Sequence, residues 1–255
     1  MSSKKKRLFL GLAISFTGIL ISSIAYAQAG KVGVSKPLVL LVVLAALSLI
    51  PFIVMMSTSF VKIAVVLSLI RSAMGTQQIP PNTIITGLAM ILTIYIMIPI
   101  GYDVYRAAGN VINQGTNQPL MSQASIEILI KGVKEGKEPV RQFLLKNVHT
   151  QERTLFYNLS LKLRSNDEDR KEIKDDDFIN LIPAFIVSEL TEAFQIGFII
   201  YLPFLVIDLV IANILLSLGM FQISPITISL PFKLLLFVLV DGWHIIIRGL
   251  ILGYV

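Results

Sequence analysis

The 255-residue sequence contains no cysteine and only two histidines, His149 and His244. Without cysteine the chain can form neither a disulfide framework nor a thiolate metal site. The two histidines lie far apart in the sequence, which does not suggest a histidine-rich metal centre. We therefore expect no metal and no cofactor.

Charged residues are also scarce. Only 15% of the residues are Asp, Glu, Lys or Arg, whereas 55% are hydrophobic and the mean hydropathy is +0.77. Soluble domains contain about 25% charged residues, so this composition predicts an integral membrane protein. Because the apolar stretches are long enough to form membrane helices, we expect an all-α membrane protein.

Basic charge is not gathered on one surface, although the net charge is +6. Four positive residues form a single run at residues 4–7, and removing that run leaves +2. Residues 101–180 contain twelve basic and twelve acidic residues, which balance one another. Since no basic face remains to bind phosphates, we do not expect nucleic acid as a partner.

The first 27 residues have the pattern of a secretory signal peptide. The basic run at residues 4–7 precedes an apolar run at residues 8–24, and Ala25-Tyr26-Ala27 has the small-x-small pattern that signal peptidase cleaves. We predict cleavage after Ala27. The alternative is an uncleaved membrane anchor, because the apolar run is long for a signal peptide. In either case the next segment starts outside the cytoplasm.

The rest of the chain divides into three parts. Residues 28–101 are expected to form a first long, bent helical hairpin. Residues 102–180, which carry most of the charge, are expected to form a small inserted helical domain outside the membrane, on the exported, periplasmic side. Residues 181–255 are expected to form a second hairpin with a pore-facing turn.

The helices of the first hairpin can be placed from apolar runs and turn residues. Residues 37–70 are longer than one crossing of a ~30 Å bilayer, so we expect a bent helix or a helix pair with the bend at Pro51. Residues 75–82 have the composition of a turn. A second helix should follow at residues 83–100 and end at the Pro-Ile-Gly sequence there.

The second hairpin carries two opposite charges, Asp208 and Lys233. Apolar helices are predicted at residues 181–218 and 229–250, so in an antiparallel hairpin the two charges should lie at similar heights. An unpaired charge in hydrocarbon costs ~2.5–3.5 kcal/mol. We therefore expect the two residues to form a structural charge pair, within one subunit or across a subunit boundary. The alternative is two separately solvated charges that line a wet lumen.

Other charged residues in apolar stretches are candidates for subunit contacts. Lys62 and Arg71 lie nine residues apart and should project to opposite sides of a helix. We expect Arg71 to act at a helix end, whereas the deeper Lys62 has Glu189 or Glu192 as a candidate partner. Asp241 stands beside a tryptophan, which also suggests a subunit contact.

Three ordered motifs stand out in the apolar parts of the chain. They are Ser59-Phe60-Val61-Lys62-Ile63, Ile182-Pro183-Ala184-Phe185 and Ser229-Leu230-Pro231-Phe232-Lys233, each within a longer matching block. These motifs resemble the FliP/SctR (YscR) family, whose members are export-gate subunits of flagellar and injectisome type III secretion. The resemblance covers about residues 38–101 and 178–250.

This resemblance implies a non-enzymatic subunit of a protein export channel. The resemblance further implies a homopentamer that binds FliQ/SctS-type and FliR/SctT-type membrane subunits and surrounds a path for unfolded protein substrates. It also implies a multi-pass location in the bacterial inner (plasma) membrane, with hairpins packed as a cone largely above the membrane plane. The segment Ser188-Glu189-Leu190-Thr191-Glu192 is more similar to the injectisome branch. The leader and the sizeable middle domain resemble the flagellar branch, which stays the alternative.

The break between the last two predicted helices is Gly219-Met220-Phe221-Gln222-Ile223. At this position the family carries a run of methionines that forms a flexible gasket across the pore, so the resemblance implies a gasket role for Met220 and Phe221. Methionine is unbranched and can repack around a passing chain, whereas Gln222 is a polar intrusion that departs from the pattern. The alternative is an interhelical turn that meets a neighbour.

Two other classes of function fit the sequence less well. An intramembrane hydrolase would need two carboxylates that share a proton, and Asp208 and Asp241 are the candidates. Lys233 offers Asp208 a neutralising partner, and no Gly-x-Gly-Asp stretch surrounds either carboxylate, so we do not expect an enzyme. A secondary transporter would show inverted repeats, but the two hairpins are not visibly alike, and four apolar segments are few for a carrier.

Overall fold

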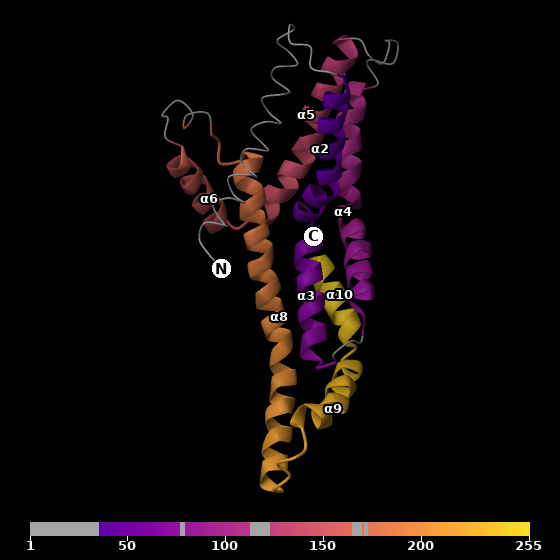
Figure 1. Ribbon diagram of the computed structural model, residues 1–255, viewed down its shortest axis with the longest axis vertical. Helices are drawn as coiled ribbons and strands as arrows, with labels where there is room; N and C mark the ends of the chain where they lie inside the picture. The colour runs from indigo at the N-terminus through magenta and orange to yellow at the C-terminus, as the bar shows by residue number, and fades with distance from the viewer. Residues whose placement is uncertain (1–35, 77–79, 113–122, 165–169, 171–172) are drawn as a thin grey trace. The chain divides into compact units, whose positions relative to one another are not determined.

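A computed structural model describes residues 36–76, 80–112, 123–164, 170 and 173–255; the predicted signal peptide lies outside these residues. All regular secondary structure in the described part of the chain is helical, which confirms the all-α prediction (Figure 1). The helices are α2 (Lys36–Met56), α3 (Phe60–Ala73), α4 (Asn82–Ile112), α5 (Gln123–Asn147), α6 (Thr150–Leu163), α8 (Phe178–Ser217), α9 (Pro225–Leu239) and α10 (Gly242–Leu252).

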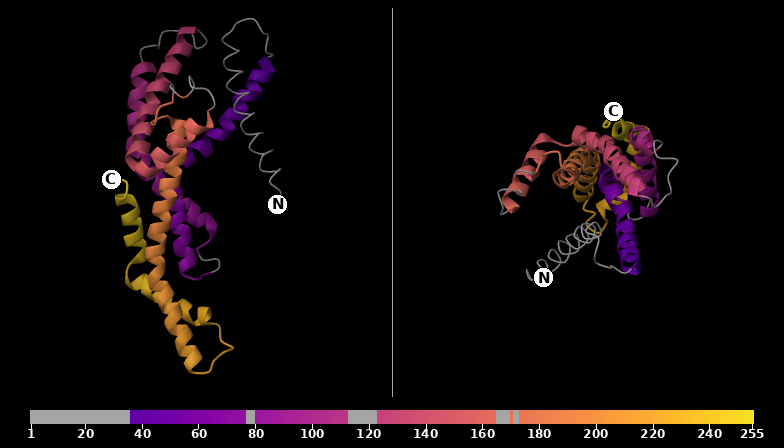
Figure 2. Two further views of the ribbon diagram at one scale, coloured as in Figure 1. Left: turned by 90° about the vertical axis from the view of Figure 1, so that its left-hand side faces the viewer. Right: turned by 90° about the horizontal axis from the view of Figure 1, so that it is seen from above.

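The chain separates into two units, residues 1–54 and residues 55–255. Most of α2 belongs to the first unit. In the second unit α3 packs against both α4 and α8, α5 packs against α4 and α8, and α6 packs against α8. Figure 2 shows α8 as a long rod that continues past α3 to its contact with α9.

The core of the second unit lies where α3 meets α8. Ile63, Val66, Leu67 and Ile70 recur at the spacing of one helix face and are completely or almost completely buried. The two helices approach closely at Gly197, where an added Cβ would lie only 2.3 Å from Leu69 Cδ1. A side chain at position 197 would therefore push the helices apart or force the leucine to move.

The first predicted hairpin begins with a pair of helices rather than one bent helix, and the break is not at Pro51. This proline lies inside α2, while α2 ends at Met56 and α3 begins at Phe60. The break falls on the polar residues 57–59, where the Thr58 hydroxyl donates to the carbonyl of Met55 at 3.2 Å. Serine and threonine offer the backbone such local alternatives to the helical ladder, which explains the position of the break.

The expected helix end near residue 100 is also wrong, because α4 continues through Pro99 to Ile112. A proline removes one helical hydrogen bond but does not forbid helix on its C-terminal side. Beyond the proline α4 packs on α5, where a Cβ on Gly136 would lie 3.4 Å from the Ala108 side chain. This packing holds the continued helix in place. In the same way α5 runs through Pro139 as one helix.

The last part of the chain bends twice. Gly219 follows α8 with φ +71°, a left-handed conformation that favours glycine, and the chain then turns back into α9. The single final helix predicted from the sequence is in fact two helices, α9 and α10, which are bent by 59°. The bend is at Asp241, whose φ of 52° interrupts the helix, and an aspartate tolerates this conformation better than most residues.

Two of the described helices are long and apolar enough to cross a membrane. They are Asn82–Gly109 within α4 and Phe178–Ser217, which is α8. The bent pair α9 and α10 would add a third span if it crosses as one unit. The structure therefore agrees with the prediction of a helical membrane protein.

Candidate functional site

A compact charge pair joins α8 to α9. Lys233 Nζ lies 2.6 Å from Asp208 Oδ2, and the Ser229 hydroxyl donates to Asp208 Oδ1 at 2.5 Å. Ser229 and Lys233 are four residues apart and so lie on one face of α9. Both oxygens of the carboxylate are therefore bound by neighbours from a single helix.

This pair is sheltered on the lysine side and partly open on the aspartate side. The Lys233 side chain is 4% exposed, whereas that of Asp208 is 27% exposed. The turn that ends α3 covers the lysine, since a Cβ on Gly75 would lie 3.5 Å from Lys233 Nζ. Gly75 has φ +75°, a left-handed conformation that favours glycine, and its Cα hydrogens leave room beside the ammonium group. The site thus connects α8, α9 and the end of α3.

A second charge cluster joins α3 to the N-terminal half of α8. Lys62 Nζ lies 3.1 Å from Glu189 Oε1 and 2.6 Å from Glu192 Oε2. The two glutamates are three residues apart on α8 and face the same way. Lys62 and Glu189 are almost completely buried. One cation therefore neutralises part of the charge of two carboxylates inside the protein.

The C-terminal part of the chain closes this cluster. The Tyr254 hydroxyl donates to Glu189 Oε2, and Lys62 Nζ lies 4.2 Å from the centre of the Tyr254 ring, a cation–π distance. Burial, and next the Glu189 carboxylate, raise the pKa of the Tyr254 hydroxyl above its usual range. The hydroxyl consequently stays protonated and acts as a donor.

The start of α6 is attached to the same cluster. His149 Nε2 lies 2.7 Å from Glu192 Oε1, and the His149 backbone N–H donates to the Ser188 hydroxyl at 3.0 Å. Ser188 in turn donates to the carbonyl of Ala184 at 2.9 Å. The cluster therefore connects α3, α6, α8 and the residues after α10 through polar contacts.

The turn between α8 and α9 exposes its apolar residues. Met220 is 45% exposed and Phe221 is 77% exposed, and Gln222 beside them is exposed as well. Phe221 at such exposure fills no core among the residues that the structure describes. The turn therefore presents a methionine and a phenylalanine at the far end of α8 (Figure 1).

Arg71 and Asp241 stand apart from both clusters. Arg71 lies in the last turn of α3 and donates to the Asn82 side chain at the start of α4, which ties the two helices together across their turn. Asp241 is exposed at the bend before α10. The contacts of Asp208 are with Ser229 and Lys233, so the structure gives the two aspartates no shared site. Among the described residues no group of His, Cys, Asp and Glu is arranged to hold a metal ion.

Sequence reasoning missed several partners in these sites. The role of Ser229 could have been predicted, because it precedes Lys233 by one helical turn and so lies on the same face of the helix. The roles of His149 and Tyr254 could not, since each reaches α8 from a segment far away in the sequence.

Comparison with known proteins identifies the family. The chain matches the FliP family over residues 43–250, most of its length. It is 50% identical over 217 residues to Yop proteins translocation protein R of Yersinia pestis, an alignment that covers 84% of this chain and 95% of the relative.

Two further relatives are named for virulence and for flagellar biosynthesis. The chain is 45% identical over 219 residues to virulence protein YscR of Salmonella typhimurium, with 86% of this chain and 97% of the relative covered. It is 38% identical over 222 residues to flagellar biosynthetic protein FliP of Bacillus subtilis, with 87% and 93% covered.

Proposed function

Because the chain belongs to the FliP family, we propose that it is the export-gate subunit through which a type III secretion system of the injectisome kind passes unfolded proteins. The observation that carries this proposal is the 50% identity to a Yersinia translocation protein over nearly the whole length of that relative. Family membership also agrees with the expectation that the chain is not an enzyme, and it leaves the secondary-transporter hypothesis without support.

In this proposal the helices form two hairpins with a small domain between them. The contacts of α3 with α4 and of α8 with α9 support the two hairpins. The charged helices α5 and α6 would make the inserted domain, on the periplasmic side of the bacterial inner membrane. Its boundary with the first hairpin would lie within α4, since that helix is continuous through residue 101.

The two charge clusters would then hold the hairpins in shape. Lys62 with Glu189 and Glu192 would fix α3 on α8, and Asp208 with Lys233 would fix α9 on α8. Removing one partner of such a pair costs ~3–5 kcal/mol because it leaves a buried charge unpaired. These residues therefore serve assembly and stability rather than chemistry.

The gate itself would be the turn with Met220 and Phe221. Several copies, a homopentamer by family expectation, would bring these turns together with FliQ/SctS-type and FliR/SctT-type subunits around one path. Flexible apolar side chains at such a constriction can exclude water and ions and still yield to a passing chain. The exposure of Phe221 at a helix end supports this role.

Deletion and complementation test the proposal. We expect a strain that lacks this chain to stop secreting its injectisome substrates, and the tagged chain to restore secretion and to co-purify with two smaller membrane subunits. Unchanged secretion in the deletion strain would contradict the proposal.

The alternative, the same role in flagellar export, draws on the 38% identity to the Bacillus protein. Motility separates the two: a deletion that abolishes swimming while needle secretion persists would favour the flagellum. Neighbouring genes for needle and tip proteins would favour the injectisome.

A further inference from the structure

Helix α6 buries none of its own residues, so little side-chain packing holds it in place. Its leucines are exposed instead, Leu155 by 47%, Leu159 by 42% and Leu163 by 84%. A helix of 14 residues is marginal in water without support from packing. The contacts that hold the start of α6 on α8 therefore decide how firmly this helix is ordered.

His149, directly before α6, makes two contacts with α8. Its backbone N–H donates to the Ser188 hydroxyl at 3.0 Å, and its Nε2 lies 2.7 Å from Glu192 Oε1. The first contact does not depend on pH, because neither group changes charge. In the second, a neutral imidazole offers a hydrogen bond, whereas a protonated one also forms an ion pair. The His149 side chain is 42% exposed, so its proton can exchange with solvent.

The carboxylate that His149 contacts belongs to a cluster with too little positive charge. Among the described residues, Lys62 is the cation that contacts both Glu189 and Glu192. With both carboxylates ionised and a neutral histidine, the cluster carries one negative charge in excess. Uncompensated charge in a sheltered site is costly, and a protonated His149 removes the excess. Protonation of His149 therefore completes the charge balance where α6 meets α8.

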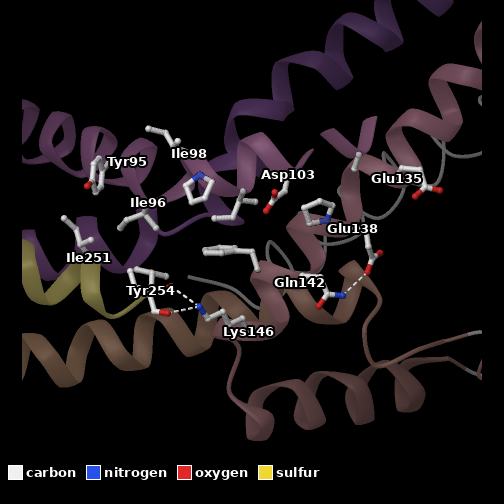
Figure 3. A pocket seen from close by; sticks show the side chains of 16 residues that line it. Tyr95, Ile96, Ile98, Asp103, Glu135, Glu138, Gln142, Lys146, Ile251 and Tyr254 are labelled. Carbon is white, nitrogen blue, oxygen red and sulfur yellow. Dashed lines mark hydrogen bonds between the residues drawn. The ribbon is translucent and has the colours of Figure 1, made fainter. Parts of the chain in front are cut away.

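The charged groups on neighbouring elements are engaged elsewhere. Lys146 of α5 donates to the main-chain carbonyls of Tyr254 and Val255, at 3.3 and 3.1 Å (Figure 3). Arg153, one turn into α6, contacts Asp175 in the segment before α8. Neither cation replaces the charge that a protonated histidine would add.

Every element around His149 contributes a titratable or charged group: Glu189 and Glu192 from α8, Lys62 from α3, Lys146 from α5, Tyr254 from the residues after α10, Asp175 from the segment before α8, and Glu152 and Arg153 from α6 itself. Of these, Glu192 is in direct contact with the imidazole. The charge on His149 is therefore felt first at Glu192.

We infer that His149 makes the attachment of α6 to α8 depend on pH, firm when the imidazole is protonated and weaker when it is neutral. The sign follows from the charges: acid gives the ring a positive charge that pairs with Glu192, and the ion pair is lost as the pH rises through the range from about 5 to 8. The inference goes beyond the export role and does not rest on it.

Hydrogen exchange of the α6 amides in the full-length, detergent-purified protein tests the inference, because exchange reports local opening. Comparing the unaltered chain with His149→Gln at the same pH cancels the intrinsic pH dependence of exchange. At about pH 5.5 we expect the variant to exchange about two- to fivefold faster, the effect of losing a partly exposed ion pair. At about pH 8 the two proteins should exchange alike. An equal ratio at both pH values would overturn the inference and assign any pH dependence to another group, such as Glu189.

Two further variants serve as a partner test and a control. Glu192→Gln removes the carboxylate but leaves Lys62 paired with Glu189. In that background, adding His149→Gln should no longer have a larger effect in acid than in base, and a persisting difference would overturn the inference. His244→Gln replaces the other histidine of the chain, which is exposed on α10, and should leave exchange in α6 unchanged. If it reproduced the effect of His149→Gln, the pH dependence would not belong to this contact.

These measurements also stand apart from the proposed function. Exchange in the purified protein needs no secretion, so a pH-independent result defeats the role of His149 and leaves the export role untouched. A deletion strain that secretes normally does the reverse.

Discussion

Ser229 donates a hydrogen bond to Asp208 at 2.5 Å, on the carboxylate oxygen that Lys233 does not use. The serine therefore orients the carboxylate toward the lysine as well as satisfying it. Because a charge-assisted hydrogen bond of this kind is worth ~1.5–3 kcal/mol, Ser229→Ala should destabilise the detergent-solubilised protein measurably, and Thr227→Ala, at an exposed position on α9, should not. Thermal unfolding measures both; equal effects would contradict the orienting role.

The charge pair itself can be tested by exchange. We expect Asp208→Ala to lower the free energy of unfolding by ~3–5 kcal/mol, because it leaves the almost completely buried Lys233 without its partner. Lys233→Met should cost less, because the remaining Asp208 is partly open to solvent and keeps its hydrogen bond from Ser229. The exchanged chain, Asp208→Lys with Lys233→Asp, should recover part of this loss. The folded fraction in membranes is the measurement. An exchange no better than either single variant would count against the pairing.

Lys62 contacts two carboxylates, so the stability lost when it is replaced should depend on how many of these carboxylates stay charged. Lys62→Met leaves Glu189 and Glu192 without their cation and should cost ~3–5 kcal/mol. Adding Glu189→Gln removes one buried charge but keeps an acceptor for Tyr254, so the double variant should be more stable than Lys62→Met alone. Thermal unfolding compares the stabilities of the two variants. A double variant less stable than Lys62→Met would refute this account.

A side chain at position 197 should destabilise the protein unless the Leu69 side chain moves. In Gly197→Val the new Cβ would lie only 2.3 Å from Leu69 Cδ1, which is a clash. Overpacking of this kind costs ~1–3 kcal/mol. Leu69→Ala in the same chain should relieve the clash, which a double-mutant cycle measures. Gly249→Ala is the control, because an added Cβ there meets nothing within 4 Å. Additive effects of Gly197→Val and Leu69→Ala would show that the two do not meet.

Met220 and Phe221 should matter for sealing and little for folding. Both are exposed in the turn, so replacing them by alanine removes little buried surface. If they close the path, the double variant should let small ions leak through the assembled gate. Membrane conductance in cells is the measurement, with Ile226→Ala on exposed α9 surface as the control. Conductance equal to that of the unaltered chain would reject the gasket role.

The sequence was most informative where charge interrupts an apolar helix. Asp208 and Lys233 stand on either side of one turn, so helical geometry alone predicted their similar heights, and the structure brings them within 2.6 Å. Lys62 had only candidate partners, because nothing local links it to a helix that begins more than a hundred residues later. The structure shows that it contacts both Glu189 and Glu192.

Prolines were the least reliable guide to helix ends. Pro51, Pro99 and Pro139 all lie inside helices, since a proline removes one helical hydrogen bond without forbidding helix on its C-terminal side. The breaks fall instead at residues 57–59 and at Asp241. Both breaks fall on residues that favour a local interruption of the helix, a Ser-Thr-Ser run and an aspartate followed by a glycine.

Helix α8 carries both charge clusters and ends at the exposed turn. A small tilt of the helix at the first cluster therefore moves the turn by a larger distance. From Glu189 to Ser217 the helix extends about 42 Å at 1.5 Å per residue. A tilt of about 5° around the Lys62 cluster would therefore displace the turn by about 4 Å, roughly the width of a side chain. Contacts made near one end of the rod set where Met220 and Phe221 stand at the other.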